Sequence, residues 1–254
     1  MTESFDWDQI TDDISSYLRL VPTPVGLKFC GTSEELQSIP GIRLSDDRFS
    51  VCQGIGRAVL FGWTVGIQKK NIHADYCRVI HGMADRDEKF VSGRMFADIW
   101  FEPGAAKKHH QSMYCLPNKY IGIAVSPLRT KRLNNVDVCV LYANSGQMFI
   151  LLSGFLYSDF RKLQFTFSGE SACNDTWVRT MLTGRPYIAL PSYAERKFGM
   201  VSDNEISLSI TPQDLVKALE GVKILYKNGL RYPIAPYGLT VDIMGGLPKS
   251  YFEY

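Results

Sequence analysis

The sequence lacks the compact motifs that usually assign a reaction. It has no Gly-x-x-x-x-Gly-Lys phosphate-binding loop, and Gly54-Ile55-Gly56 is without the third glycine of a dinucleotide fingerprint. No His-Glu-x-x-His sequence occurs, and we predict that the adjacent His109 and His110 are surface residues, because neighbours on a helix point in different directions. Residues 169–173 superficially match a hydrolase elbow, but a cysteine replaces its closing glycine, so Ser171 is predicted to be a turn residue.

The sequence also lacks a charge excess and a long apolar run. Its 28 basic and 26 acidic residues give a net charge of +2, so there is no electrostatic argument for binding nucleic acid or an anionic membrane. The most apolar segment, residues 148–157, is about half of the roughly 20 residues that a membrane helix needs. The first six residues are acidic and do not have the order of a signal peptide. We therefore expect a cytoplasmic protein that binds neither nucleic acid nor membrane.

Six cysteines are present, and no two of them form a Cys-x-x-Cys pair. In the reducing compartment expected here, thiols are more often buried, catalytic or metal-bound than disulfide-linked. Cys139 lies within the apolar run 136–142 and is predicted to be a core residue. Cys30 and Cys115 are also expected to be structural.

The other three cysteines, Cys52, Cys77 and Cys173, are the strongest candidates for a site. Cys52 and Cys173 lie where helices should begin, with Ser50 as the predicted N-cap before Cys52. The free amides and dipole of a helix N-terminus favour a thiolate, which is both a nucleophile and a metal ligand. Cys77 is followed by His81 at helical spacing, which leaves a metal role for that histidine open. Because the three are far apart in the sequence, only the fold can assemble them.

The apolar periodicity alternates between helical and strand-like segments and predicts one α/β domain over residues 1–254, with a mixed sheet and helices packed on it. An amphipathic helix is expected within residues 1–19, a charged loop at 85–89, and a tail from 237 to 254. Strands are predicted near Val25, Tyr120, Val136, Leu163 and Glu205, with a further alternating run at 64–72. The predicted interior helices are 52–61, 103–113, 147–157, 176–182 and 212–227.

Several segments of the chain resemble the uncharacterised ArCR family of archaea and bacteria, also known as domain of unknown function 169. The resemblance extends over about residues 20–236, and its most specific block is 165–199. Similar proteins tend to have cysteines at the positions of Cys52, Cys77 and Cys173. One departure is that Cys77 precedes Arg78-Val79-Ile80 rather than proline or small residues. The matching segments are 24–29, 51–53, 119–120, 125–128, 137–138, 144–148, 165–169 with Cys173, 182–186, 190–191, 196–199 and 229–233.

This resemblance implies that the fold gathers Cys52, Cys77 and Cys173, as in the ligation of an iron–sulfur cluster. Cubane clusters normally take four cysteines, so three would leave one iron of a [4Fe–4S] cluster open as a Lewis acid. The leading interpretation is a redox or lyase-type enzyme of anaerobic metabolism that acts on a small anionic substrate held by Arg57, Arg179 or Arg196.

Two other classes stay open. The first is an electron-transfer or assembly protein with a redox partner protein, in which His81 or Cys115 supplies the fourth ligand. The second is a metal-free redox enzyme that uses Cys52 and Cys173. A homo-oligomer is also left open.

Overall fold

The β-branched runs of the sequence form one mixed sheet. A computed structural model of the chain describes residues 5–246, 249–251 and 253, and within this part seven strands are ordered β2-β3-β1-β4-β7-β6-β5. All neighbouring strands are antiparallel except β5 and β6, which are parallel. The strands are β1 (Val25–Cys30), β2 (Val65–Gln68), β3 (Gly122–Pro127), β4 (Val138–Asn144), β5 (Phe165–Thr166), β6 (Tyr187–Ala189) and β7 (Glu205–Ile210).

The predicted single α/β domain with a mixed sheet is confirmed, although two strands differ from expectation. The strand expected near Leu163 is only the two residues of β5. The sequence prediction did not include β6, which is three residues long. Both strands lie at the β5 edge of the sheet, where hydrophobic alternation is too short to give a signal.

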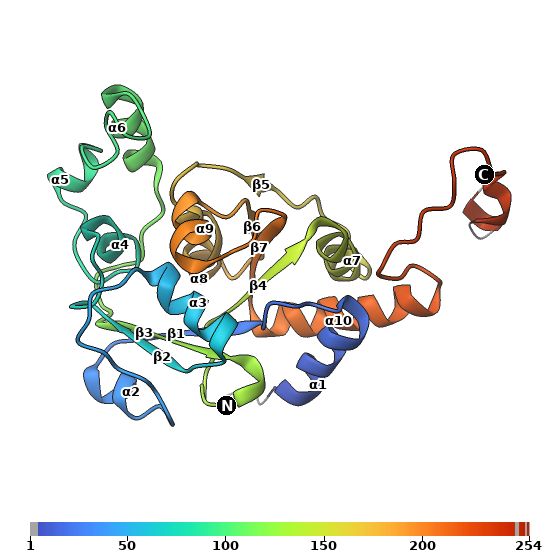
Figure 1. Cartoon of the computed structure of the whole chain (residues 1–254), viewed down its shortest axis with the longest axis horizontal. Coiled ribbons are helices and arrows are strands. Elements are labelled where there is room, and N and C mark those ends of the chain that lie inside the picture. Colours follow the sequence, from blue (N-terminus) through green and yellow to red (C-terminus); the bar gives the residue numbers. More distant parts are fainter. Residues whose placement is uncertain (1–4, 247–248, 252, 254) are drawn as a thin grey trace.

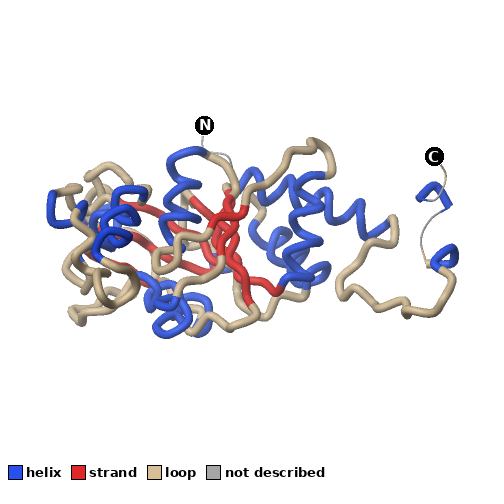
Figure 2. The backbone as a smooth tube through the Cα atoms, turned by 90° about the horizontal axis from the view of Figure 1, so that it is seen from above, coloured by secondary structure: helices blue, strands red, loops and turns tan. Residues whose placement is uncertain are grey.

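Side chains of β4 alternate between two hydrophobic cores on opposite faces of the sheet. Val138, Val140 and Tyr142 belong to one core, whereas Cys139 and Leu141 belong to the other. We call these faces the α3 face and the α10 face after the helices that cover them. Figure 2 shows helices on both sides of the sheet.

The α3 face carries the helices of the middle of the chain and most of those that follow β5. Helix α3 contacts β1, β2 and β3, and the π-helical segment η3 contacts β4, β6 and β7. In Figure 1, α4, α5 and α6 continue this layer beyond the end of the sheet. Its helices are α3 (Val51–Phe61), α4 (Asp75–Ile80), α5 (Glu88–Val91), α6 (Pro103–Ser112), η3 (Asn174–Val178), α8 (Arg179–Thr183) and α9 (Tyr193–Gly199).

The α10 face is covered by helices from the two ends of the chain and by α7. Helices α7 and α10 pack so closely that a Cβ on Gly154 or Gly221 would collide with the backbone of the other helix. Cys139 is fully buried beneath them, which confirms its predicted place in the core. The elements of this face are α1 (Trp7–Asp13), η1 (Ile14–Leu18), α2 (Ser33–Gln37), α7 (Ser145–Leu156) and α10 (Pro212–Lys227).

Two predictions about polar segments are wrong. The segment 85–89, expected to be a charged loop, is a loop only as far as Asp87; its last two residues begin α5, whose N-cap Asp87 accepts a hydrogen bond from the Phe90 amide at 2.8 Å. His109 and His110 are buried among aromatic rings on α6, not exposed. Adjacent histidines can both be buried here because aromatic side chains surround α6 on more than one side.

The chain after α10 runs away from the body of the molecule (Figure 1). It contains two short 3₁₀ turns, η4 (Ile243–Gly245) and η5 (Lys249–Tyr251). Among all the residues that the structure describes, no helix has both the length and the apolar character needed to cross a membrane.

Candidate functional site

Three cysteines from three separate elements of the α3 face meet at one place. Cys77 and Cys52 both raise the pKa of Cys173, and Cys77 raises the pKa of Cys52. Buried thiols influence one another in this way only when they are neighbours, because the interaction falls with distance. All three are free thiols. The structure therefore brings together the three cysteines that the sequence singled out.

Cys52 is the second residue of α3, which begins with a capping box. The Gln53 amide donates to Ser50 Oγ at 3.0 Å, and the Ser50 amide donates to Gln53 Oε1 at 2.9 Å. This confirms Ser50 as the N-cap and fixes the first turn that carries Cys52.

Cys77 lies on α4, and a hydrogen-bonded histidine joins this helix to the segment of Cys173. Trp177 Nε1 donates to His81 Nε2 at 3.0 Å, and His81 Nδ1 lies 2.7 Å from the Cys77 carbonyl oxygen. Both ring nitrogens are therefore occupied in a neutral imidazole that carries its proton on Nδ1. Burial lowers the pKa of His81 to about 4, in agreement with this neutral form.

Cys173 lies in the first turn of a helix that continues as the π-helical segment η3. The turn is held by Ser168, whose hydroxyl donates to Asp175 Oδ2 at 2.5 Å, and by Thr176, whose hydroxyl donates to the Ala172 carbonyl at 2.7 Å. The helix ends at Gly184, as the sequence predicted. π-Helical turns occur frequently at functional sites.

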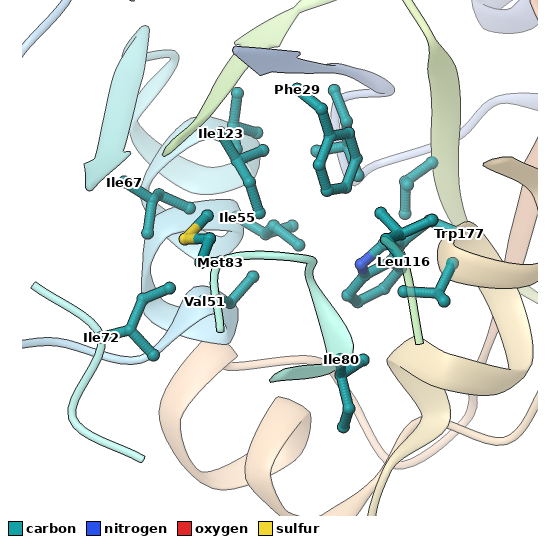
Figure 3. Packing of buried hydrophobic residues seen from close by; sticks show 14 of the residues in the cluster. Phe29, Val51, Ile55, Ile67, Ile72, Ile80, Met83, Leu116, Ile123 and Trp177 are labelled. Carbon is teal, nitrogen blue, oxygen red and sulfur yellow. The ribbon is translucent and has the colours of Figure 1, made fainter. Parts of the chain in front are cut away.

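One hydrophobic core anchors all three cysteine-bearing elements. Figure 3 shows Val51 and Ile55 of α3, Ile80 of α4 and Trp177 of η3 pointing into this core. Trp177 is fully buried. Since each anchor is within four residues of a cysteine, packing of this core fixes the relative positions of the three thiols.

The three thiols are not the low-pKa thiolates that helix N-termini suggested. Burial is the largest cause that raises the pKa of each, and it raises the pKa of Cys77 to about 12 even though Tyr76 hydrogen-bonds to that thiol. The charge of Glu195 further raises the pKa of Cys52 and Cys173. Desolvation and neighbouring acidic groups therefore outweigh the helix dipole, which corrects the expectation of activated thiolates.

Glu195 is buried beside the thiols with both carboxylate oxygens occupied. Tyr142 Oη donates to Oε1 at 3.0 Å, and the Ser192 amide donates to Oε2 at 2.9 Å. The second contact belongs to the capping box that begins α9. Burial raises the pKa of Glu195.

Glu170, three residues before Cys173, is a second acidic neighbour and is bound differently. Its side chain is buried, yet Oε2 has no hydrogen-bond partner, and neither does the hydroxyl of the adjacent Ser171. Burial, followed by the charge of Glu195, raises the pKa of Glu170 to about 7. Glu170 in turn raises the pKa of Cys52 and Cys77, which places it beside the thiols.

A cleft of about 400 Å³ opens beside Cys52, with Tyr142 and Glu195 also in its wall. Helices α3 and α9 form two sides of it and pack backbone to backbone, because a Cβ on Gly56 would lie 2.6 Å from the Gly199 carbonyl oxygen. This close approach holds Cys52 and Glu195 next to each other at the cleft. Cys77 and Cys173 are absent from the cleft wall, so Cys52 is the thiol of the three through which a ligand in the cleft would meet the site.

A sequence model of the uncharacterised ArCR family matches residues 13–221. The chain belongs to this family. No curated protein and no solved structure matches the chain in the other two comparisons. The matched region contains all three cysteines, Glu170, Glu195 and the cleft residues from position 21 to position 205, so the whole site is part of the ArCR region.

The three arginines predicted to hold a substrate are dispersed in this ArCR protein. Arg57 lies over the Phe49 ring and lines a small pocket that adjoins the cleft through Gly56 and Gly199. Arg196 does not line the cleft itself, but it donates at 2.6 Å to the carbonyl of Ser202, which does. Arg179 is held between the rings of Tyr114 and Tyr187. Arg57 and Arg196 therefore lie near the cleft on different sides of it, and Arg179 is bound elsewhere.

Sequence reasoning missed the acidic and phenolic neighbours of the thiols. The spacing Ser192-x-x-Glu195 is a capping-box signal that would have predicted α9, although not the proximity of Glu195 to Cys52. Nothing local in the sequence distinguishes Glu170 from a surface glutamate. Its position becomes informative only when three distant elements are packed together.

Among the described residues, no group of three or more histidine, cysteine, aspartate or glutamate side chains is arranged so that it could hold a metal ion. The cysteine site is thus a set of neighbouring thiols and carboxyl groups rather than a preformed tetrahedral centre for one ion.

Proposed function

We propose that this ArCR protein holds a [4Fe–4S] cluster on Cys52, Cys77 and Cys173 and acts on a small molecule that binds in the adjoining cleft. The observation that carries the proposal is the meeting of three free thiols from α3, α4 and the segment before η3 beside that cleft. The cluster would supply a Lewis-acidic iron that no cysteine binds.

The chemistry of the donor set supports a cationic occupant. Three buried thiols, of which Cys77 raises the pKa of the other two, with Glu170 and Glu195 beside them, do not readily lose their protons without a compensating positive charge. The groups that act on the pKa of Cys52 and Cys173 include no lysine or arginine side chain. A metal centre supplies that charge, and a thiol that coordinates a metal is deprotonated outright.

A cluster and a single ion place their ligands differently. Four ligands of one zinc ion must converge at about 2.3 Å from the same atom. Each cysteine of a cubane instead binds its own iron, so the sulfurs lie farther apart.

The raised pKa values argue against the metal-free alternative. A dithiol redox enzyme needs an attacking thiolate, and burial leaves Cys52, Cys77 and Cys173 protonated. The neutral thiol is a poor nucleophile. The cleft at Cys52 favours an enzyme over an electron-transfer protein, because a partner protein would not need a cavity at the cluster.

Within this proposal, Arg57 is the residue that would contact an anionic part of the substrate. It lines the small adjoining pocket, whereas the larger cleft has acidic and apolar walls. A redox or lyase-type reaction in anaerobic metabolism fits an exchangeable iron in such a cleft.

Anaerobic reconstitution with ferrous iron and sulfide tests the proposal. We expect a brown protein with about four irons and four sulfides per chain and broad visible absorption that bleaches on reduction. A colourless protein that retains neither iron nor sulfide after desalting would refute it.

A further inference from the structure

We infer that the cleft beside Cys52 binds an ω-amino carboxylate, a molecule with an ammonium group and a carboxylate at opposite ends of an apolar chain. Glu205 takes the ammonium end, and Arg57 takes the carboxylate end in the small adjoining pocket. The inference rests on the proposed function, because it takes the cleft as the substrate site, and it names the class of that substrate.

The wall of the cleft has acidic residues but no basic ones. Its described residues include Glu195 and Glu205 and no lysine, arginine or histidine. Arg196 lies close by, but it donates to the Ser202 carbonyl at 2.6 Å and lies 3.6 Å from Asp203 Oδ1, so its charge is already engaged. The cleft therefore favours a ligand with a positive charge over one that is only anionic.

Of the two carboxyl groups, that of Glu205 has an oxygen left for a ligand. Both oxygens of Glu195 accept hydrogen bonds inside the protein. In Glu205, Oε2 accepts a hydrogen bond from the Ser202 amide at 2.8 Å, whereas Oε1 has no hydrogen-bond or ion-pair partner among the described residues. Glu205 is the first residue of β7 and pairs with Asn144 of β4, so the sheet holds its backbone in place. An ammonium group, which has only donors, suits this free oxygen.

The small pocket beside the cleft holds an unpaired positive charge. It has a volume of about 160 Å³, and Gln53 and Arg57 of α3 are in its wall. The Arg57 guanidinium carbon lies 4.4 Å from the centre of the Phe49 ring, and the guanidinium has no hydrogen bond or ion pair in the part of the chain that the structure describes. A guanidinium over a ring face keeps its in-plane N–H donors free, and their geometry matches that of a carboxylate.

The cleft and the small pocket share a wall, and that wall is apolar. Gly56 and Leu60 of α3 and Gly199 and Met200 at the end of α9 line both. A ligand that pairs both free charges therefore carries them at the two ends of an apolar chain, which lies along this wall. An α-amino acid, whose two charged groups share one carbon atom, places both in the same pocket and leaves one protein charge unpaired.

Titration calorimetry with compounds of equal carbon number tests the assignment. The probes are the ω-amino acids from aminobutanoate to aminooctanoate and, for each chain length, the alkylamine, the alkylcarboxylate and the α-amino acid. We expect the best ω-amino acid to bind at least about 10-fold more tightly than its three counterparts, since each of them lacks one of the two charge-assisted contacts. The full-length protein is used both as purified and after reconstitution with iron and sulfide.

Two variants separate the two ends of the ligand. Arg57→Gln should bind the best ω-amino acid about 10-fold more weakly, while its affinity for the alkylamine stays at the wild-type value. Glu205→Gln should show the same loss, while its affinity for the alkylcarboxylate is unchanged. The unchanged affinities distinguish the loss of one contact from a general loss of structure, which circular dichroism checks independently.

Matched controls carry the same kinds of charge outside both pockets. Lys197 lies over the Tyr193 and Phe198 rings, and Asp203 is fully exposed on the loop before Glu205; neither lines the cleft or the small pocket. Lys197→Gln and Asp203→Asn should therefore bind the ω-amino acid like the wild type.

Three results would overturn the assignment. They are an alkylamine, alkylcarboxylate or α-amino acid that binds as tightly as the best ω-amino acid, no binding across the whole series, and equal losses in the test and control variants. None of these depends on bound iron, because the protein as purified is measured too. A protein that takes up no iron would instead remove the proposed cluster and leave the binding result standing.

Discussion

The two faces of the sheet are built from similar side chains but differ in what they leave unsatisfied. On the α10 face, Cys139 lies among aliphatic residues, and the long α7–α10 contact fills the space above it. On the α3 face, three further cysteines lie beside two buried carboxyl groups, with Glu170 Oε2 and Ser171 Oγ unpaired. The α3 face therefore carries buried polar groups without partners close to its cysteines, whereas Cys139 on the α10 face has only apolar neighbours.

Each face of the sheet also has one close helix–helix contact, and the two contacts have different consequences. Gly154 and Gly221 let α7 and α10 touch over an apolar core. Gly56 and Gly199 let α3 and α9 touch where Cys52 and Glu195 meet at the cleft. A glycine-mediated helix contact thus stabilises the core on one face and positions the cysteine site on the other.

Exchanging cysteines for serine should give the largest contrast between the faces. Cys52→Ser or Cys173→Ser replaces a soft thiolate by a hydroxyl that binds iron poorly, so we expect loss of nearly all bound iron. Cys139→Ser places a hydroxyl in an apolar core and should lower the free energy of unfolding by about 1–3 kcal/mol while iron content stays at the wild-type level. Iron and sulfide analysis together with urea unfolding measures both effects.

Iron binding that survives the loss of these cysteines would contradict the proposed difference between the two faces. Full iron occupancy in Cys52→Ser and Cys173→Ser would make these cysteines core residues like Cys139, and the two faces would then be equivalent.

Adding one methyl group at each close contact should give the next largest effect. Gly56→Ala and Gly154→Ala both push helices apart, and each should lower the free energy of unfolding by about 1–3 kcal/mol, reduced in part by the better helix propensity of alanine. Only Gly56→Ala should also weaken iron retention, because it moves α3 relative to α9. Thermal unfolding and iron release to a chelator distinguish the two variants. Equal iron retention would show that the α3–α9 contact does not position the site.

The α10 face was largely predictable from the sequence. Its long helices have strong periodic signals and clear ends, such as the Thr211 cap and Pro212 at the first position of α10. Cys139 was placed correctly because a thiol within a β-branched run is most simply a core residue.

The surroundings of the cysteines on the α3 face could not be predicted from the sequence. Its helices are short, α4 and α9 having six and seven residues, so periodicity gives little signal. The pKa of a thiol depends on burial and on residues distant in the sequence, such as Glu195 beside Cys52, and local helix position alone predicted the wrong direction. The positions of the three arginines could not be predicted for the same reason, because the contacts of a basic side chain depend on tertiary packing.

The last expected effect is a pH dependence that arises from the α3 face and is absent at neutral pH. Burial lowers the pKa of His109 to about 4, whereas in the unfolded chain it titrates near 6.5. Between these values the unfolded state binds more protons than the folded state, so stability falls as the pH falls from about 6.5 towards 4. His109→Phe keeps a ring beside Phe96 and Phe101 but removes this titration. We therefore expect the wild type to lose up to about 3 kcal/mol more than His109→Phe across that window, measured by urea unfolding at several pH values. Parallel stability curves for the two proteins would show that His109 takes up its proton as easily in the folded chain as in the unfolded one.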